Sequence, residues 1–549
     1  MTSDFMSNGV DCPTPLTSAT PLTDRTNSPR TSSTNVLKFG GQSHSKLHPQ
    51  PKANTPLGTS VGKFPLDIVN VVKSSSVDND VAIVCSARSS NTKAAGTTNR
   101  LLRAAAEAEN HKQFKHLIEE VRQDHIETAE FYIKSEQICS RLKSEVEEEC
   151  SLVVRILEAA QTLGETSPRS RDKVMSTGEK LSCRFMTALL QDRGVDAEYI
   201  DLADIIDFKV SHSLDQHFYD NVARRLGEKL YNMAGKVPVI TGYFGSIPRG
   251  LLTTVGRGYT DLCAALVAVG IKAKELQIWK EVDGIFTADP RKVPTAKLIP
   301  QISPAEAAEL TFYGSEVIHP STMDQVIRAR IPIRIKNVMN PRGGGTVIYP
   351  DTPTELDSAL AGHDPKLFRS RSSTLLSEQR KPKRPTAVTM KHKILVMNIH
   401  SNKRSLSHGF FAGIFATLDK WRLSVDVIST SEVNMSMALH SEAPLYTGGG
   451  DDEYQIVDQD LRGAIEELQR YGTVDIIPEM AIVSLVGKQM KNMVGIAGRM
   501  FSTLGENNVN IEMISQGASE INISCVIEER DADRALNILH TNLFTFLES

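Results

Sequence analysis

The chain has 549 residues, 40% of them hydrophobic and 23% charged, so it is long enough for about two to four domains with ordinary cores. Its formal charge of −4 excludes the strong overall positive charge of a dedicated nucleic-acid-binding protein. Seven cysteines, from Cys12 to Cys525, show no CxxC spacing, so we expect neither disulfides nor zinc and place the chain in a reducing cytoplasm.

The first segment, residues 1–34, is rich in Ser, Thr and Pro and predicts a disordered tail. It lacks the apolar core of a secretory signal, and Asp4 and Asp24 make it a poor transit peptide. No stretch of about 18 apolar residues follows, so we expect no transmembrane span.

Residues 35–39 predict a strand that runs into the glycine turn of KFGG, which contains Lys38, Gly40 and Gly41. Such a turn can bring backbone N–H groups and a lysine charge to a phosphate, although the motif alone is more commonly a plain turn. Residues 42–58 then have three prolines, two histidines and no apolar period. A second small-residue turn, with Thr59 and Ser60, precedes the next predicted helix.

As far as about residue 350, short apolar runs alternate with helical stretches. The runs at 81–87, 237–245, 276–282 and 331–338 are mostly continuously apolar, as in strands that are covered on both faces. This alternation predicts an α/β domain, residues 35–350, with a mostly parallel sheet. Residues 101–165 instead show helical spacing throughout and predict an inserted antiparallel helical pair.

The C-terminal part begins after a polar, proline-containing stretch at residues 351–390, which we interpret as a linker. Its basic run RKPKRP is more typical of a solvated linker than of a nucleic-acid patch. Residues 391–470 and 471–549 each show strand, helix, two strands, helix, strand. This repeat predicts two ferredoxin-like α+β modules.

Three further motifs place polar side chains at the ends of predicted elements. VMSTGEKLS, with Glu179, is placed at a strand-to-helix junction, where a helix cap is the simplest interpretation. TVGRGYTDLCAALVA places Arg257, Thr260 and Asp261 before an apolar helix, which is also compatible with capping. WKEVDGIFTADPRK follows a buried strand, where an ordinary connection competes with a ligand crevice.

Taken in order, KFGG, CSARSSNTKAAGTTN, MSTGE, GRGYTD, KEVDGIFTADPR and GSEVIHP resemble the aspartate kinases of the amino-acid-kinase family, in their fungal, monofunctional form. The C-terminal repeat is similar to the paired ACT regulatory modules of that family. The resemblance covers about residues 35–546, except 42–58. It implies an amino-acid-kinase three-layer αβα sandwich with a mostly parallel sheet, followed by two ACT modules.

The resemblance assigns catalytic roles to Lys38, against the transferring phosphate, and to Asp261, which would organise it. It implies that Glu179 takes the ammonium group of aspartate and that Arg257 grips its α-carboxylate. The other substrate-pocket positions are Ser86, Thr98 and Thr260. The nucleotide-contacting positions are Gly40, Gly41, Thr59, Ser60, Lys280, Phe286 and Arg291.

The implied reaction transfers the γ-phosphoryl group of ATP to the β-carboxylate of L-aspartate and gives 4-phospho-L-aspartate, the first step of threonine and methionine biosynthesis. The acceptor is already ionised, so positioning and charge neutralisation suffice without a general base. Mg²⁺ would be held by the ATP phosphates and water, with no metal ligands expected from the protein. The ACT modules imply L-threonine as an allosteric inhibitor and a homo-oligomer. The implied effector positions are Gly409, Phe410, Ser429, Ser431, Glu432 and Asn434.

Residues 42–58 interrupt the resemblance, because their removal would restore the unbroken family motif KFGGTSVGKF. They are either a tolerated surface loop or, as we favour, an unspliced intron of seventeen codons. With the phosphate loop split, we expect the chain as written to have little kinase activity and an intact fold elsewhere. Two alternatives stay open: an amino-acid sensor in which only the ACT pair works, and a sister kinase that acts on another carboxylate.

Overall fold

The computed structural model describes residues 34–39, 60–88, 96–210, 214–231, 233, 235–256, 258–314, 318, 320–350, 384–401, 409–431, 433–440, 445–447, 455–488, 490, 493–517 and 521–545. Most of the predicted tail, the 42–58 segment and most of the predicted linker lie outside these residues. Among the helices of the described residues, none combines the length and the apolar sequence that a membrane span requires.

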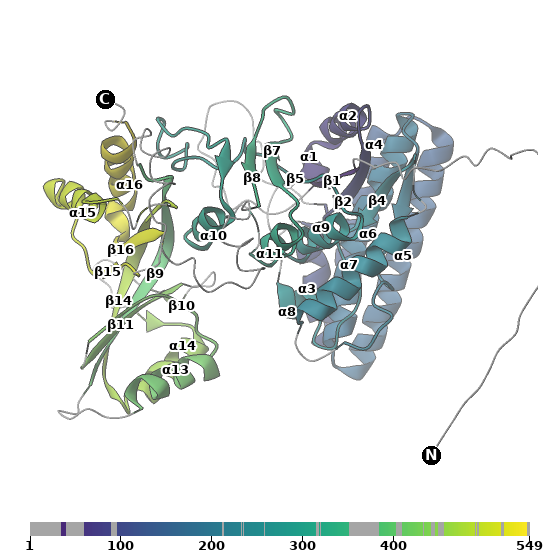
Figure 1. Cartoon of the computed structure of the whole chain (residues 1–549). Coiled ribbons are helices and arrows are strands. Elements are labelled where there is room, and N and C mark those ends of the chain that lie inside the picture. Colours follow the sequence, from purple (N-terminus) through teal and green to yellow (C-terminus); the bar gives the residue numbers. More distant parts are fainter. Residues whose placement is uncertain are drawn as a thin grey trace, which may run out of the picture. The chain divides into compact units, whose positions relative to one another are not determined.

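The N-terminal domain is built on an eight-stranded sheet in the order β3-β4-β2-β1-β5-β7-β8-β6 (Figure 1). Every pairing in it is parallel except that of β7 with β8, which confirms the predicted mostly parallel sheet. Its strands are β1 (Thr34–Phe39), β2 (Asp80–Cys85), β3 (Ala197–Ile200), β4 (Val237–Thr241), β5 (Glu275–Lys280), β6 (Gln301–Ile302), β7 (Ile333–Asn337) and β8 (Thr346–Ile348).

Helices cover both faces of this sheet, because successive side chains of a strand point to opposite sides. On β1, Leu37 packs with the helices α2 to α6, whereas Val36 packs with α7, α9, α10 and α11. This gives the three layers that the continuously apolar strands predict. The helices are α1 (Ser60–Lys63), α2 (Pro65–Ser75), α3 (Thr97–Glu109), α4 (Lys115–Tyr132), α5 (Glu136–Leu163), α6 (Pro168–Asp192), α7 (Gln216–Leu230), α8 (Leu251–Val255), α9 (Tyr259–Gly270), α10 (Pro304–Phe312) and α11 (Pro320–Arg328).

The range predicted as an inserted helical pair, residues 101–165, contains most of α3 as well as α4 and α5, and α4 and α5 pack against each other. A short turn joins them, and Ser135 caps α5 by accepting a hydrogen bond from Ile138 N. Asp192, at the end of α6, accepts hydrogen bonds from the backbone N–H groups of Lys134 (3.1 Å) and Ser135 (2.8 Å). The insertion is thereby tied to the helix that carries Glu179.

The C-terminal part forms one six-stranded antiparallel sheet in the order β10-β11-β9-β14-β16-β15. The long strands β9 and β14 pair from Ala387 with Val486 to Ser401 with Gly472, so the two repeats share one sheet. β9 begins at Ala387, ahead of the predicted module start at residue 391. The strands are β9 (Ala387–Ser401), β10 (Val425–Thr430), β11 (Asn434–His440), β14 (Gly472–Val486), β15 (Met513–Ser515) and β16 (Asn522–Glu528), with a separate pair β12 (Tyr446–Thr447) and β13 (Gln455–Ile456). The helices are α13 (Phe410–Lys420), α14 (Gln459–Leu468), α15 (Ile496–Glu506) and α16 (Ala532–His540), with a short 3-10 helix at Glu529–Asp531 and a short π-helix at Thr541–Thr545.

Candidate active site

The candidate site lies where three neighbouring parallel strands end. β1 pairs with β2 on one side and with β5 on the other, and Phe39 lies opposite both Cys85 and Trp279. Ser86 continues this pairing, because its N–H donates to the carbonyl of Phe39 at 3.1 Å. The carboxyl ends of parallel strands form a natural ligand crevice. The register therefore brings Lys38, Ser86 and Lys280 to one edge of the sheet.

The two predicted catalytic residues form a buried ion pair. Lys38, on β1, is only 1% exposed, and its Nζ contacts Oδ1 of Asp261 in the first turn of α9. A buried ammonium group requires such a partner, and a carboxylate at a helix N-terminus is favoured by the helix dipole. The fold therefore fixes the Lys38 charge at the junction of β1 and α9.

Glu179 lies in the middle of α6, so the prediction that VMSTGEKLS occupies a strand-to-helix junction is wrong. Gly178 beside it allows α6 to approach its neighbours, since an added Cβ would stand 3.1 Å from both Ala87 Cβ and Thr97 Cγ2. Glu179 is 2% exposed, and its Oε1 accepts a 2.8 Å hydrogen bond from Thr260 Oγ1. The short polar residues of this motif serve close packing and a buried carboxylate, not a cap.

Burial raises the pKa of Glu179 to about 7, although the hydroxyls of Thr260 and Tyr259, the backbone of Tyr243 and the charge of Lys38 oppose this shift. Its Oε2 atom is buried and accepts no hydrogen bond of normal geometry from the described residues. A buried carboxylate oxygen without a well-formed hydrogen bond is costly unless a cationic or donor group reaches it. The arrangement suits a ligand ammonium group.

Gly242, directly after β4, leaves the space that Thr260 occupies. An added Cβ there would overlap Thr260 Cγ2 and lie 2.8 Å from its Oγ1. We therefore expect Gly242→Ala to displace Thr260 from Glu179 and to lower the free energy of unfolding by about 1–3 kcal/mol, measured by urea titration. Adding Thr260→Ser, which removes the closest atom, should restore part of the loss. A Gly242→Ala protein as stable as its parent would contradict this packing.

A second group of charges lies beside the pair of Lys38 and Asp261. Lys280, the last residue of β5, is 6% exposed, and Glu281 follows it. Burial raises the pKa of Glu281, and the positive charges of Lys63, Lys280 and Lys38 oppose this shift. Lys38, Lys63 and Lys280 thus all act electrostatically on Glu281, and with Lys38 paired to Asp261 the group holds three lysines and two carboxylates, a positive balance that suits phosphate oxygens. Lys63 and Glu281 were missed as site residues by the sequence analysis, although TSVGKF and KEVDG contain them.

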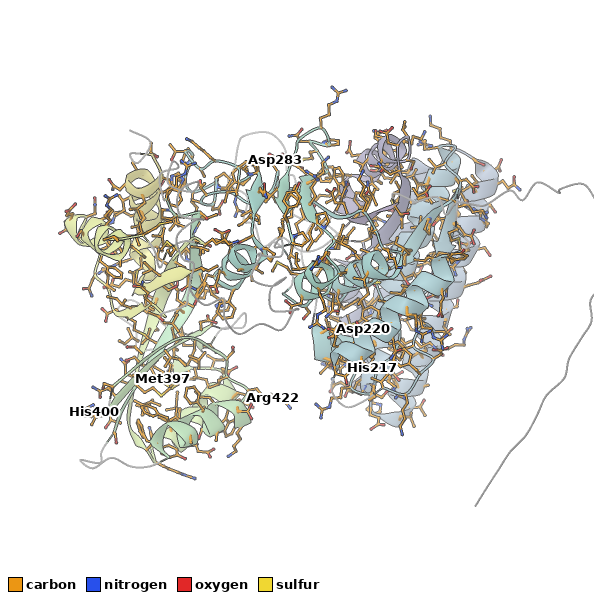
Figure 2. All side chains as sticks on the ribbon, in the orientation of Figure 1. His217, Asp220, Asp283, Met397, His400 and Arg422 are labelled. Atoms are coloured by element: carbon orange, nitrogen blue, oxygen red, sulfur yellow. The ribbon has the colours of Figure 1, made fainter. Side chains whose placement is uncertain are left out.

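The segment after β5 carries the other predicted nucleotide positions. Oδ1 of Asp283, which Figure 2 labels, accepts hydrogen bonds from the side-chain amides of Asn337 (3.2 Å) and Asn340 (3.1 Å). Phe286 is half-buried and pairs through its backbone with Leu298. Arg291 is exposed, and its guanidinium binds both carboxylate oxygens of Asp289, at 2.8 and 2.6 Å. In this structure Arg291 is therefore directed to its neighbour Asp289.

Some of the remaining predicted site residues lie within the described residues and some lie outside them. Ser86 and Thr98 are half-buried, and Thr98 lies in the first turn of α3. Ser60 begins α1. The predicted positions outside the described residues are Gly40, Gly41, Thr59, Arg257 and Glu432.

The predicted effector positions lie on α13 and on the turn between β10 and β11. Gly409 precedes α13 with a positive φ of 92°, which favours glycine, and Phe410 packs in one core with Met435 of β11. The exposed Ser429 lies on β10. Ser431 Oγ accepts from Asn434 N at 3.1 Å, and the Asn434 side chain contacts His400, which Figure 2 labels. The structure therefore brings Ser431 and Asn434 together at a surface turn.

Comparison with known proteins gives a consistent family assignment. Residues 33–337 match the model of the amino acid kinase family, and residues 483–543 match an ACT domain. The aspartokinase of Candida albicans is 54% identical over 497 residues, covering 88% of either chain. That of Saccharomyces cerevisiae is 53% identical over 503 residues, covering 89% of this chain and 92% of the yeast protein.

Solved structures agree with this assignment. E. coli aspartokinase III in complex with aspartate and ADP, in its R-state, is 27% identical with a TM-score of 0.68, covering 93% of this chain and 99% of that chain. The T-state complex of the same enzyme with lysine and aspartate has a TM-score of 0.67 at 26% identity, covering 93% of this chain and 100% of that chain. The chain therefore belongs to the aspartokinases of the amino acid kinase family, ATP-dependent kinases that carry a C-terminal ACT domain.

Proposed function

We propose that Lys38 and Asp261 position the transferring phosphoryl group of ATP and that Glu179 holds the ammonium group of L-aspartate. One observation carries this assignment: Thr260 and Asp261 are consecutive residues of α9. Thr260 holds Glu179 through a hydrogen bond, and Asp261 holds Lys38 through an ion pair. A single helix turn thus sets the distance between the proposed amino-acid pocket and the proposed phosphoryl site.

In the proposed mechanism the substrate ammonium group binds Oε2 of Glu179, and Arg257 binds the α-carboxylate. The β-carboxylate is then directed towards the ammonium group of Lys38, which stabilises the charge that develops on the transferring group. No proton has to be removed from the ionised acceptor. E. coli aspartokinase III, which binds aspartate and ADP, supports this arrangement by its similar fold.

Mg²⁺ is proposed to arrive with ATP. The lysine-rich surroundings of Glu281 match polyphosphate oxygens, whereas a resident divalent ion would need several oxygen ligands. The ATP phosphates and water would therefore hold the ion, which neutralises charge on the nucleotide. Lys38, Lys63 and Lys280 would contact the phosphates themselves.

The proposed activity is tested by trapping the acyl phosphate with hydroxylamine in the presence of MgATP. We expect hydroxamate to form with L-aspartate and not with glutamate, N-acetylglutamate or carbamate. Product with one of the other acceptors would favour the sister-kinase alternative. No product with any acceptor, from the full chain and from a variant without residues 42–58, together with threonine binding, would favour the amino-acid sensor.

The pKa of Glu179 predicts how substrate affinity varies with pH. The carboxylate is ionised only above its pKa of about 7, and only the ionised form attracts an ammonium group, so the KM for aspartate should fall as pH rises through about 7. Glu179→Gln should raise this KM by about tenfold or more and remove the pH dependence. Thr260→Val removes a donor that lowers the pKa, so the inflection should move to higher pH. An inflection unchanged in Glu179→Gln would contradict the assignment.

We further propose that L-threonine inhibits the enzyme at the turn between β10 and β11. An inhibitor must bind one conformation better than another, so Ser431→Ala should raise the threonine concentration for half-inhibition by about tenfold and spare kcat. Ser74→Ala, at an exposed hydroxyl on α2, is the matched control and should change neither quantity. Unaltered threonine inhibition in Ser431→Ala would contradict the proposed site.

From the resemblance to the fungal aspartate kinases we also propose that the protein is a homo-oligomeric, cytoplasmic enzyme at the start of threonine and methionine biosynthesis. Phe411 and Phe415, on α13, are 41% and 44% exposed and offer an apolar surface for association between ACT modules. The cysteines within the described residues are free thiols, which suits a reducing compartment. Light scattering on the purified chain measures the oligomeric state.

A further inference from the structure

The segment after β5 folds into a hairpin that we call the 285–299 hairpin. Thr287 N donates to the carbonyl of Lys297 at 2.9 Å, and Ile299 N donates to that of Ile285 at 2.8 Å. Phe286 lies in the first arm, and Arg291 lies towards the tip. Two of the proposed nucleotide-contacting residues, Phe286 and Arg291, therefore lie on this hairpin.

His540, the last residue of α16, joins both arms of this hairpin. Its ring is 2% exposed, with Nε2 at 2.9 Å from Thr287 Oγ1 and Nδ1 at 3.2 Å from Thr295 Oγ1. Thr287 Oγ1 already accepts from Lys297 N, so its own proton is available for Nε2, and Nδ1–H can donate to Thr295. The neutral imidazole therefore satisfies both hydroxyls at once.

The hairpin also packs as part of the C-terminal core. Ala288 and Val293 are 3% and 1% exposed and lie in one apolar cluster with Leu536 and Leu539 of α16. Val388 N, on β9, donates to the carbonyl of Thr287 at 2.9 Å. The His540 ring stacks on Phe544, with centroids 5.0 Å apart. The regulatory part of the chain therefore holds the hairpin, while Asp283 at its base is held by the kinase domain.

We propose that His540 is a positioning residue for nucleotide binding, acting from the second ACT module through Thr287 and Thr295 without touching the nucleotide. A movement of α16 that separates these hydrogen bonds would release the hairpin and weaken nucleotide binding. This inference rests on the proposed nucleotide role of Phe286 and Arg291. By this link, a movement of the C-terminal domain would change nucleotide affinity in the kinase domain of the same chain.

The test uses His540→Phe, which keeps the stacking on Phe544 and removes both hydrogen bonds. Asn537→Ala, at a half-buried side chain of α16 whose amide donates to the carbonyl of Asp533 in the same helix, is the control for the helix itself. Thr295→Val is the second variant, because it leaves the core ring in place and loses one of the two bonds. Amide hydrogen exchange of residues 285–299 and the affinities for MgADP and aspartate are measured on the full chain and on the chain without residues 42–58.

We expect His540→Phe to speed hairpin exchange by about tenfold and to weaken MgADP binding by about threefold to tenfold, with aspartate affinity unchanged. Thr295→Val should have a smaller effect in the same direction, and Asn537→Ala none. Unchanged exchange in Thr295→Val and His540→Phe, or faster exchange with unaltered MgADP affinity, would overturn the inference. If the parent chains bind no MgADP, the proposed nucleotide site fails, while the exchange data still measure the attachment of the hairpin.

Discussion

Deletion of residues 42–58 is expected to raise the aspartate kinase activity of this chain by about two orders of magnitude or more. The segment separates Gly40 and Gly41 from Thr59 and Ser60, whose backbone N–H groups would have to converge on one phosphate. Chain stability tolerates long insertions, because loop-closure entropy grows slowly with length. Catalysis does not, since a displacement of about 1 Å costs about a hundredfold in rate. Hydroxamate formation by the two forms, assayed side by side, measures the effect.

A deletion of equal length in the predicted linker, residues 355–371, is the matched control and should leave activity unchanged. Both deletions should melt at the same temperature as the parent. Full activity of the long form, together with a mature transcript that keeps the seventeen codons, would show that the segment is genuine and that our interpretation is wrong.

Lys38→Met is expected to lower kcat by about three orders of magnitude in whichever form of the chain is active. The lysine charge acts on the transferring group in the transition state more than on the bound substrates, so kcat should fall far more than the KM for aspartate rises. Near pH 7 a modest rise in this KM is expected, because Lys38 also lowers the pKa of Glu179. Quenched-flow or steady-state kinetics at saturating MgATP and aspartate measures the effect. A kcat within tenfold of the parent value would contradict the catalytic role of Lys38.

Lys38→Met also leaves Asp261 without its ion-pair partner. A control must therefore separate the resulting loss of stability from the loss of catalysis. Lys391→Met breaks a largely buried pair with Asp426, whose atoms are 2.7 Å apart, in the C-terminal sheet. It should lower the melting temperature about as much as Lys38→Met and retain kcat within a few-fold. The double variant Lys38→Met with Asp261→Asn should recover stability without recovering kcat.

The sequence predicted those features that depend on local burial. The strands at Val81 and Leu276 belong to runs that are apolar on both faces, and such runs require helices above and below a mostly parallel sheet. Helical spacing in the insertion predicted α4 and α5 for the same reason, since periodicity records which side of an element is covered. The ordered motifs then indicated the family, which the comparisons confirm.

Only the tertiary structure decided which groups meet. The residues around Glu179 favoured a helix cap in the sequence, whereas the structure places them within the long, largely buried helix α6. Lys38 reaches Asp261 because β1 and α9 are neighbours in the fold, although a long stretch of chain separates them. His540 reaches Thr287 only because the second ACT module packs on the hairpin. The hydrophobic pattern of a segment reflects which of its faces is buried, so the sequence of that segment alone can predict it. Contacts between residues that are distant in the chain depend on strand order and packing, which are properties of the whole fold.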